Sequence, residues 1–250
     1  MNVLGVQLEV LQIDGHADLE PIVFLHEGLG SVAMWRDFPA QVCAATGRAG
    51  WVYSRRGYGK SAPALLPLSV DYMHYEALTV LPALLVQFGI KRPVLLGHSD
   101  GGTIALLHAS QCDTAACIVM APHLFVEDIS LRSIAAARQA YETGRLRSKL
   151  RAFHDDVDNA FWQWCEVWLC DAFASFNIQT QCDRIACPLL AIQGVDDPYG
   201  TTAQVKALVP GADNKKGELR KLLELKACGH SPHKDQPGAV LQALVDFLKL

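Results

Sequence analysis

The sequence lacks several features that would assign it to a specialised class of protein. Charged residues make up 19% of its 250 residues, and 22 Lys and Arg stand against 26 Asp and Glu. Without a basic excess to neutralise phosphates, we expect no nucleic-acid partner. No apolar run approaches the ~18 residues of a membrane span, and the start lacks a signal-peptide pattern. These absences predict a soluble, cytoplasmic protein with no membrane partner.

The eight cysteines lack the spacing of a metal site or a disulfide framework. There is no CxxC pair and no regular Cys/His ladder. We therefore expect reduced thiols that act as small buried hydrophobes. A cluster around His154 and Asp156 is acidic, but clustered acids are common on exposed helix faces. The prediction is that the protein has neither a metal nor a cofactor.

Half of the residues are apolar, which is ample for a large folded core and excludes a disordered chain. Short apolar runs alternate with helical patterns, as in a parallel sheet covered on both faces. The sequence predicts an α/β fold of about eight mostly parallel strands flanked by helices. The main runs occupy residues 21–28, 50–57, 93–99, 116–121, 187–194 and 222–229. Residues 3–7 and 9–13 are expected to pair as an antiparallel edge hairpin.

One interval, residues 122–186, contains no strand pattern and is helical throughout. It predicts a helical cap inserted into a core made of residues 1–121 and 187–250. Within it, residues 161–176 are apolar almost all round, so they must be covered on two sides. Simple packing would explain this, but a pocket lining is an alternative for its three tryptophans. These are Trp162, Trp164 and Trp168.

The clearest chemical signal is GHSDG at residues 97–101, which fits GxSxG between a strand and a helix. The small residues at both ends allow a sharp turn that projects the Ser99 hydroxyl. At the start of a helix, the amide of Asp100 faces any negative charge that develops nearby. Ser99 is thus a candidate nucleophile.

A serine needs a base to remove its proton and a third group to orient that base. Asp196 and Asp197 follow the run that ends at residue 194, and His230 follows the last run. The chain order of serine, acid and histidine is the order found in α/β-hydrolases.

On these motifs the chain resembles the α/β-hydrolase superfamily over essentially its full length, as a serine-nucleophile, esterase-like member with a helical cap. The resemblance implies a catalytic triad of Ser99, Asp197 and His230, with Asp196 and His233 in supporting places. It also implies an oxyanion hole. HEGLGS at residues 26–31 resembles the family's HGxPxS loop, which assigns the two amides to Gly28 and Asp100.

Two positions depart from the family pattern. Glu27 stands where glycine is usual. We expect it in a buried ion pair with a cation such as Arg36, Arg55 or Arg56, and contact with the substrate is the alternative. RRGYGKS at residues 55–61 resembles the family's DxRGxGxS turn, with Ser54 in place of aspartate. That turn is expected to be structural.

Two other classes of function are open to test. Residues 28–33 read GLGSVA and satisfy GxGxxA, which would suit an NADP-dependent oxidoreductase. A non-catalytic ligand receptor on the same fold is the second alternative. The favoured prediction is a serine hydrolase that acts on a small carboxylic ester, with thioesters, lactones or C–C bonds as alternatives. Its partner is then a small-molecule acyl substrate, while the oligomeric state is left open.

Overall fold

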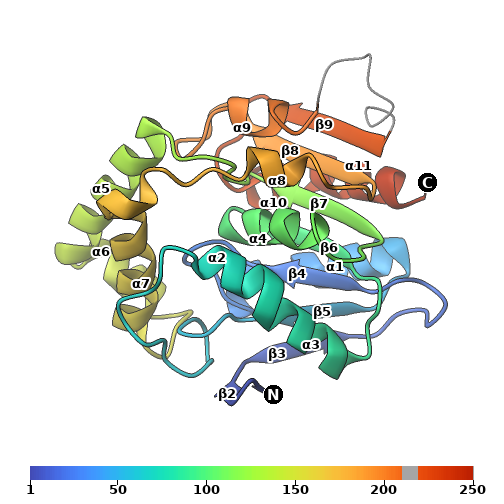
Figure 1. Cartoon of the computed structure of the whole chain (residues 1–250), viewed down its shortest axis with the longest axis horizontal. Helices are drawn as coiled ribbons and strands as arrows, with labels where there is room; N and C mark the ends of the chain where they lie inside the picture. Colours follow the sequence, from blue (N-terminus) through green and yellow to red (C-terminus); the bar gives the residue numbers. More distant parts are fainter. Residues whose placement is uncertain (210–218, 250) are drawn as a thin grey trace.

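A computed structural model describes residues 1–209 and 219–249, and its centre is a seven-stranded sheet (Figure 1). β3 pairs antiparallel with β5, and every other neighbouring pair is parallel. The predicted α/β class is therefore confirmed, with seven strands in the sheet rather than about eight. In spatial order the strands are β3 (Val10–Ile13), β5 (Gly50–Tyr53), β4 (Ile22–Leu25), β6 (Val94–His98), β7 (Ala116–Met120), β8 (Leu189–Gly194) and β9 (Arg220–Leu225).

The expected hairpin at the start of the chain is wrong in its pairing. β1 (Asn2–Val3) pairs with β2 (Val6–Gln7) in a separate two-stranded sheet. The turn between them has positive φ at Leu4 and Gly5, which reverses the chain within two residues. β3 is thereby free to join the main sheet beside β5, so an antiparallel edge strand is present but has another partner.

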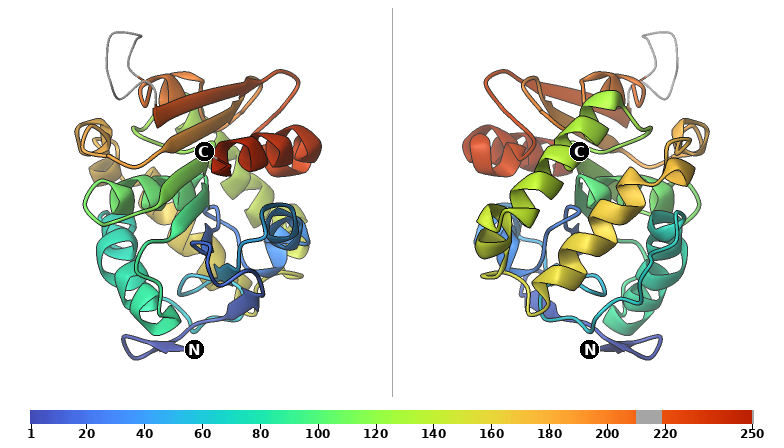
Figure 2. Two further views of the ribbon diagram at one scale, coloured as in Figure 1. Left: turned by 90° about the vertical axis from the view of Figure 1, so that its right-hand side faces the viewer. Right: turned by 90° about the vertical axis from the view of Figure 1, so that its left-hand side faces the viewer.

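Helices cover both faces of the sheet (Figure 2). α1 (Phe38–Thr46) and α11 (Pro237–Leu248) pack on one face. α3 (Leu81–Phe88) and α4 (Asp100–Ala109) pack on the other. Successive strand residues point to opposite faces of the sheet. The central strands β4, β6, β7 and β8 are buried at every position, so they read as nearly continuous apolar runs, whereas the edge strands β3 and β9 are partly exposed.

Several short helices connect these layers. The α3 helix continues without a break from two shorter segments, the second of which is a π-helix. The short elements are η1 (Ala33–Trp35), α2 (Tyr72–Tyr75), η2 (Glu76–Val80), α9 (Ala203–Lys206) and α10 (Pro232–Asp235).

The chain between β7 and β8 is helical in the structure. Its helices α5, α6 and α7 lie beyond one end of the sheet (Figure 1), and a bridge between Phe125 and Asn177 brings the ends of this segment together. Its division from the core at 122–186 remains a prediction, and residues 210–218 and 250 of the expected core lie outside the described part. The elements are α5 (Asp128–Glu142), α6 (Arg145–Leu150), α7 (Val157–Leu169), η3 (Asp171–Phe173) and α8 (Gln179–Cys182).

The structure also bears on the expectations for the cysteines and for membrane-spanning segments. All eight cysteines are free thiols. Among the described residues, none of the helices combines the length and apolar character needed to cross a bilayer.

The turn between β6 and α4 depends on two glycines. A Cβ at Gly97 would overlap the carbonyl of Gly101, and a Cβ at Gly101 would overlap the carbonyl of Leu25 on the neighbouring strand. Gly102, one residue further, has more room, because a Cβ there would lie 3.2 Å from the Cβ of Pro122. The start of α4 can therefore lie close to β6 and β4 only because positions 97 and 101 carry no Cβ.

We expect Gly101→Ala to lower the free energy of unfolding by about 2–3 kcal/mol, because the new methyl group meets rigid backbone. Gly102→Ala is the matched control in the same helical turn, and it should cost less than about 1 kcal/mol, since alanine also favours the helix. Urea denaturation of both variants measures this difference. Equal losses would show that the close approach at 101 is unimportant.

Candidate functional site

Ser99 lies at the sharp turn between β6 and α4. Its backbone has φ 53° and ψ −120°, a conformation that non-glycine residues rarely adopt. The Ser99 amide donates to the carbonyl of Met120 at 2.8 Å, and its carbonyl accepts from the Thr103 amide at 3.0 Å. These bonds hold the strained backbone, and the side chain extends above the end of the sheet.

His230 reaches Ser99 from the loop after β9. Its Nε2 lies 2.9 Å from the Ser99 Oγ, and its Nδ1 lies 2.8 Å from the Asp197 Oδ2. Because a carboxylate only accepts, the proton of the neutral ring sits on Nδ1. Nε2 is then free to accept the serine proton. The structure thus brings together three residues that are far apart in the chain.

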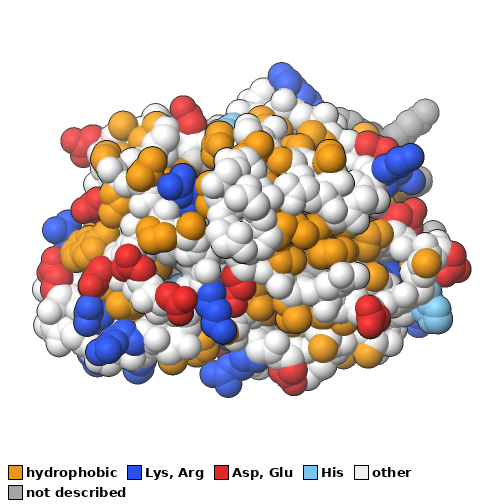
Figure 3. Space-filling model, turned by 90° about the horizontal axis from the view of Figure 1, so that it is seen from below, with side chains coloured by type: hydrophobic (Ala, Val, Ile, Leu, Met, Phe, Trp, Pro, Cys, Tyr) orange, Lys and Arg blue, Asp and Glu red, His pale blue; other side chains and the backbone are white. Residues whose placement is uncertain are grey.

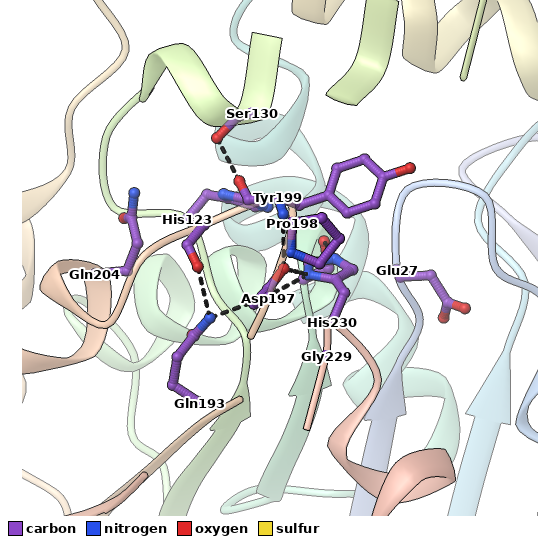
Figure 4. A network of polar contacts seen from close by, with 12 residues as sticks. Glu27, His123, Ser130, Gln193, Asp197, Pro198, Tyr199, Gln204, Gly229 and His230 are labelled. Carbon is purple, nitrogen blue, oxygen red and sulfur yellow. Dashed lines mark hydrogen bonds and ion pairs between the residues drawn. The ribbon is translucent and has the colours of Figure 1, made fainter. Parts of the chain in front are cut away.

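Asp197 is held by more than the histidine (Figure 4). The Gln193 side chain donates to its Oδ2 at 2.7 Å, and the Tyr199 amide donates to its Oδ1 at 2.7 Å. Burial alone would raise the pKa of Asp197, but the hydrogen bonds and charge of His230 together with the Tyr199 amide lower it. The neighbouring Asp196 is exposed. Of the two candidate acids, only Asp197 contacts His230.

His98, Glu27 and Lys234 form a chain of polar contacts next to the backbone of His230. The His98 Nε2 donates to the carbonyl of His230 at 2.6 Å, and its Nδ1 lies 3.4 Å from Glu27. Glu27 also pairs with Lys234 at 3.4 Å. Burial raises the pKa of Glu27, but the charges of His98 and Lys234 lower it well below its usual range. Glu27 therefore does form an ion pair, but with Lys234 and not with one of the three arginines named from the sequence. It is half-buried and also lines the cavity beside Ser99.

The loop of residues 26–31 is fixed through its carbonyl groups. Arg55 donates to the carbonyls of His26 and Glu27, and the His26 ring also donates to the Glu27 carbonyl at 2.7 Å. In a planar trans peptide the amide points opposite to the carbonyl, so these bonds turn the Gly28 amide away from Arg55. In the part of the chain that the structure describes, that amide makes no hydrogen bond.

A cavity of about 140 Å³ adjoins the Ser99 hydroxyl. Gly28 and Asp100 both line it, as the oxyanion prediction requires, and so do two of the three predicted tryptophans, Trp164 and Trp168. A Cβ at Gly28 would overlap the Trp164 indole, so this helix residue packs directly on the loop.

Trp162 lies elsewhere. It packs edge-on against Tyr141 and Phe161, and the Arg138 guanidinium lies 5.5 Å from its ring centre. Its side chain therefore belongs to the packing of α5 against α7 and not to the Ser99 cavity.

Sequence reasoning missed several residues around Ser99. His123 and Tyr199 line the cavity, and each ring lies near the His230 ring, at 5.8 Å and 4.8 Å between centres. Burial lowers the pKa of His123 to about 3, so it is a neutral ring at neutral pH. His123 comes three residues after β7, at the same edge of the sheet as Ser99, and that position is the signal that could have indicated it.

The side chain of Asp100 points away from solvent into a polar cluster. Its Oδ2 accepts from the Tyr72 hydroxyl at 2.6 Å, and the Arg55 guanidinium lies 3.9 Å away. The Tyr72 oxygen accepts in turn from the Trp168 indole at 3.1 Å. Burial raises the pKa of Asp100, which Arg55 and Tyr72 partly oppose. The residue expected only for its amide therefore also anchors a buried network.

The dinucleotide alternative does not fit the loop after β4. A Rossmann glycine motif needs a helix that starts at the glycines, whereas GLGSVA leads only into η1, and α1 begins at Phe38. The Glu27 carboxylate packs against Gly30, where a pyrophosphate would approach. The oxidoreductase prediction is therefore wrong.

The acidic cluster in the α6–α7 region has ordinary partners. His154 accepts from the Gly59 amide and donates to the Leu29 carbonyl, both at 3.0 Å. Asp156 caps α7, and Asp158 pairs with Arg147. Within residues 1–209 and 219–249, no group of three or more His, Cys, Asp or Glu could hold a metal.

Comparison with known proteins gives three kinds of similarity. A family described as "Alpha/beta hydrolase family" matches residues 22–243. Among curated proteins, mouse sn-1-specific diacylglycerol lipase ABHD11 is 39% identical over 100 residues, and its zebrafish (Danio rerio) counterpart is 36% identical over 96. The mouse match covers 40% of this chain but only 31% of the relative, so less than a third of that protein is represented.

Among solved structures, an enol-lactonase from Burkholderia xenovorans LB400 aligns with a TM-score of 0.76 and 17% identity, covering 99% of this chain and 98% of that one. An esterase from Exiguobacterium antarcticum aligns with a TM-score of 0.78 and 17% identity, covering 100% and 98%. At this identity the likeness concerns the fold.

The histidines behind the site make stability depend on pH. His233 is buried against Trp35, and neither of its ring nitrogens has a hydrogen bond among the described residues. Burial lowers its pKa to about 2. Below about pH 6.5 the His233 imidazole is protonated in the unfolded chain but stays neutral in the folded protein. The free energy of unfolding therefore falls as the pH falls, by at most about 1.4 kcal/mol per pH unit for this group.

We therefore expect His233→Phe to raise the free energy of unfolding by about 1–2 kcal/mol at pH 7, because a buried unpaired polar ring is removed. The variant should also lose less stability between pH 6.5 and pH 5. Exposed His16 provides the control as His16→Phe. Denaturant unfolding across this pH range measures both effects, and an unchanged slope for His233→Phe would contradict the assignment.

Proposed function

Since the chain belongs to the alpha/beta hydrolase family, we propose that it is a serine hydrolase that cleaves a small carboxylic ester through an acyl-enzyme intermediate. The observation that carries the proposal is the 2.9 Å contact between the Ser99 Oγ and the His230 Nε2, with Asp197 on the other ring nitrogen. Activation of a serine requires this arrangement of base and orienting acid.

In the first step, the Ser99 Oγ attacks the acyl carbon while its proton passes to the His230 Nε2. The carbonyl π bond becomes a lone pair on oxygen. The ring then carries a positive charge that buried Asp197 stabilises, and the lowered pKa of Asp197 keeps this group ionised. When the tetrahedral intermediate collapses, the proton on Nε2 passes to the departing alcohol.

Two amides are proposed to bind the developing oxyanion. The Asp100 amide is at the first position of α4, where helical amides have no partner within the helix and the helix dipole favours negative charge. The Gly28 amide is the second donor, and its orientation is supported by the bonds that Arg55 makes to the preceding carbonyl. Loss of one such donor typically costs ~10² to 10³ in rate.

In the second half of the reaction, a water molecule takes the place of the alcohol. His230 removes a proton from the water as its oxygen attacks the acyl carbon, and the proton then returns to the Ser99 Oγ as the acid leaves. Both half-reactions use the same base and the same oxyanion donors.

The size of the Ser99 cavity supports a short acyl group. About 140 Å³ is close to the volume of an engineered cavity that holds benzene. The enol-lactonase and the esterase of similar fold suggest lactones and simple esters as the first substrates to test. The diacylglycerol lipase relatives add longer acyl esters, and thioesters and C–C bonds stay as alternatives on the same triad.

Ser99→Ala should lower kcat by about 10⁵- to 10⁶-fold on the best nitrophenyl ester, thioester, lactone or diketone of a substrate panel, because no other group can form the acyl-enzyme. The fold should persist, as judged by circular dichroism. A fluorophosphonate should label the wild type stoichiometrically and spare the variant. A wild-type Ser99 that stays unlabelled and turns over none of the panel would favour the receptor alternative.

The two neighbouring acids give a matched pair. Asp197→Asn should lower kcat by about 10³- to 10⁴-fold, since the His230 ring would lose its partner and its tautomer. Exposed Asp196→Asn should change kcat by less than about threefold. Steady-state kinetics on the same ester distinguish them. A larger loss for Asp196→Asn would move the role of the acid to that residue.

A further inference from the structure

A second cavity, of about 160 Å³, lies on the other side of the polar cluster around Asp100. It is enclosed by the N-terminal hairpin, the loop after β5 and the α2–η2 helix. Most of its wall is apolar, including Val3, Val6, Leu8, Leu68 and Val80. None of the residues that line it lines the Ser99 cavity. It is therefore a separate space and not an extension of the candidate active site.

Three polar atoms of residues in this apolar wall are buried and have no hydrogen bond among the described residues. They are the Tyr58 hydroxyl oxygen, the Glu76 Oε2 and the Gln163 Nε2. Leaving a buried polar atom unpaired is costly, so native proteins rarely retain several in one cavity. The Gln163 amide is a donor, and the Glu76 carboxyl group is an acceptor when ionised. One ligand hydroxyl group could satisfy these two, because it accepts one hydrogen bond and donates another.

The charges around the cavity favour a neutral occupant. Arg55 lines the wall, but its guanidinium already serves two backbone carbonyls and lies 3.9 Å from Asp100. Burial raises the pKa of Glu76 to about 7, although nearby Arg55 opposes this. Arg56 also lines the wall and donates to the Pro63 carbonyl. An anion would lie beside the Glu76 carboxyl group, and a cation would lie beside the two guanidinium groups.

The entrance to this cavity is also apolar. Three of its lining residues, Leu4, Leu65 and Tyr75, are 55%, 75% and 56% exposed. The N-terminal hairpin is at the lower end of the molecule in Figure 1, and the view from below shows hydrophobic side chains gathered in a band across that face (Figure 3). A ligand with an apolar body would reach the cavity across this surface.

We propose that this cavity is a second ligand site, for a small neutral molecule with an apolar body of about the size of a benzene ring and one hydroxyl group. The size follows from the volume, since an engineered apolar cavity of about 150 Å³ binds benzene. The hydroxyl group pairs with Glu76 and Gln163. Phenol is the simplest probe of this class, and toluene has the same shape without the hydroxyl group.

The site shares a wall with the candidate active site. Tyr72 lines the second cavity, and its hydroxyl group bonds to Asp100 and to the Trp168 indole, which both line the Ser99 cavity. Arg55 lines the second cavity as well and holds the loop that carries Gly28. An occupant would thus contact the residues that support both proposed oxyanion donors.

Isothermal titration of the full chain with phenol tests the proposal through matched leucines, one half-buried in each cavity. Leu68→Trp should fill the second cavity and weaken phenol binding at least tenfold, whereas Leu29→Trp, in the Ser99 cavity, should leave it within twofold. Thermal unfolding checks that both variants fold. Unchanged binding in Leu68→Trp, or loss of binding in Leu29→Trp alone, would overturn the assignment, as would a wild type that does not bind phenol.

A milder variant tests the hydroxyl contact. Gln163→Met keeps the size of the side chain but removes the donor, so it should weaken phenol binding about tenfold and leave toluene binding unchanged or stronger. Equal effects on both probes would show that the polar atoms do not recognise the hydroxyl group. Because binding is measured without turnover, this test is independent of the proposed hydrolysis.

Discussion

The close approach of α4 to the sheet is the constraint on which the site depends. Two glycines allow the helix to start against the neighbouring strand, and Ser99 between them takes a backbone conformation that a side chain normally avoids. This one turn sets the position of the hydroxyl group and the direction of the helix, and therefore the direction of the Asp100 amide. His230 and Asp197 arrive on separate loops, but they meet Ser99 because parallel strands end at the same edge of the sheet.

This geometry explains how much could be predicted from the sequence. Strands that are buried on both faces appear as short apolar runs, and residues that follow such runs gather at one edge, so Ser99, Asp197 and His230 could be chosen from local patterns. The partners of charged side chains could not be predicted in this way. Glu27 pairs with Lys234, 207 positions away, and no local pattern joins them. The pairing of β1 with β2 depended on a two-residue turn that the apolar pattern does not encode.

Arg55 is a clearer example of a charged residue whose partners could not be predicted from the sequence. In the sequence it belongs to a turn with an expected structural role, where the motif arginine is Arg56 and Arg55 occupies an unspecified position. In the structure Arg55 is buried and donates to the backbone of the loop that carries Gly28, whereas Arg56 donates to the Pro63 carbonyl near the surface. A buried guanidinium with several acceptors orients backbone groups more firmly than apolar packing would. Its importance comes from the strand order, which places β5 beside β4.

The contacts of the helical segment with this loop constrain how a substrate can enter. Trp164 of α7 rests on Gly28, and His154, just before α7, donates to the carbonyl of Leu29. A hinge that swung α6 and α7 outward as a rigid body would remove both of these contacts from the loop that carries the Gly28 amide. Access to the serine by side-chain rearrangement, with the helices in place, would instead keep the loop assembled during each catalytic cycle.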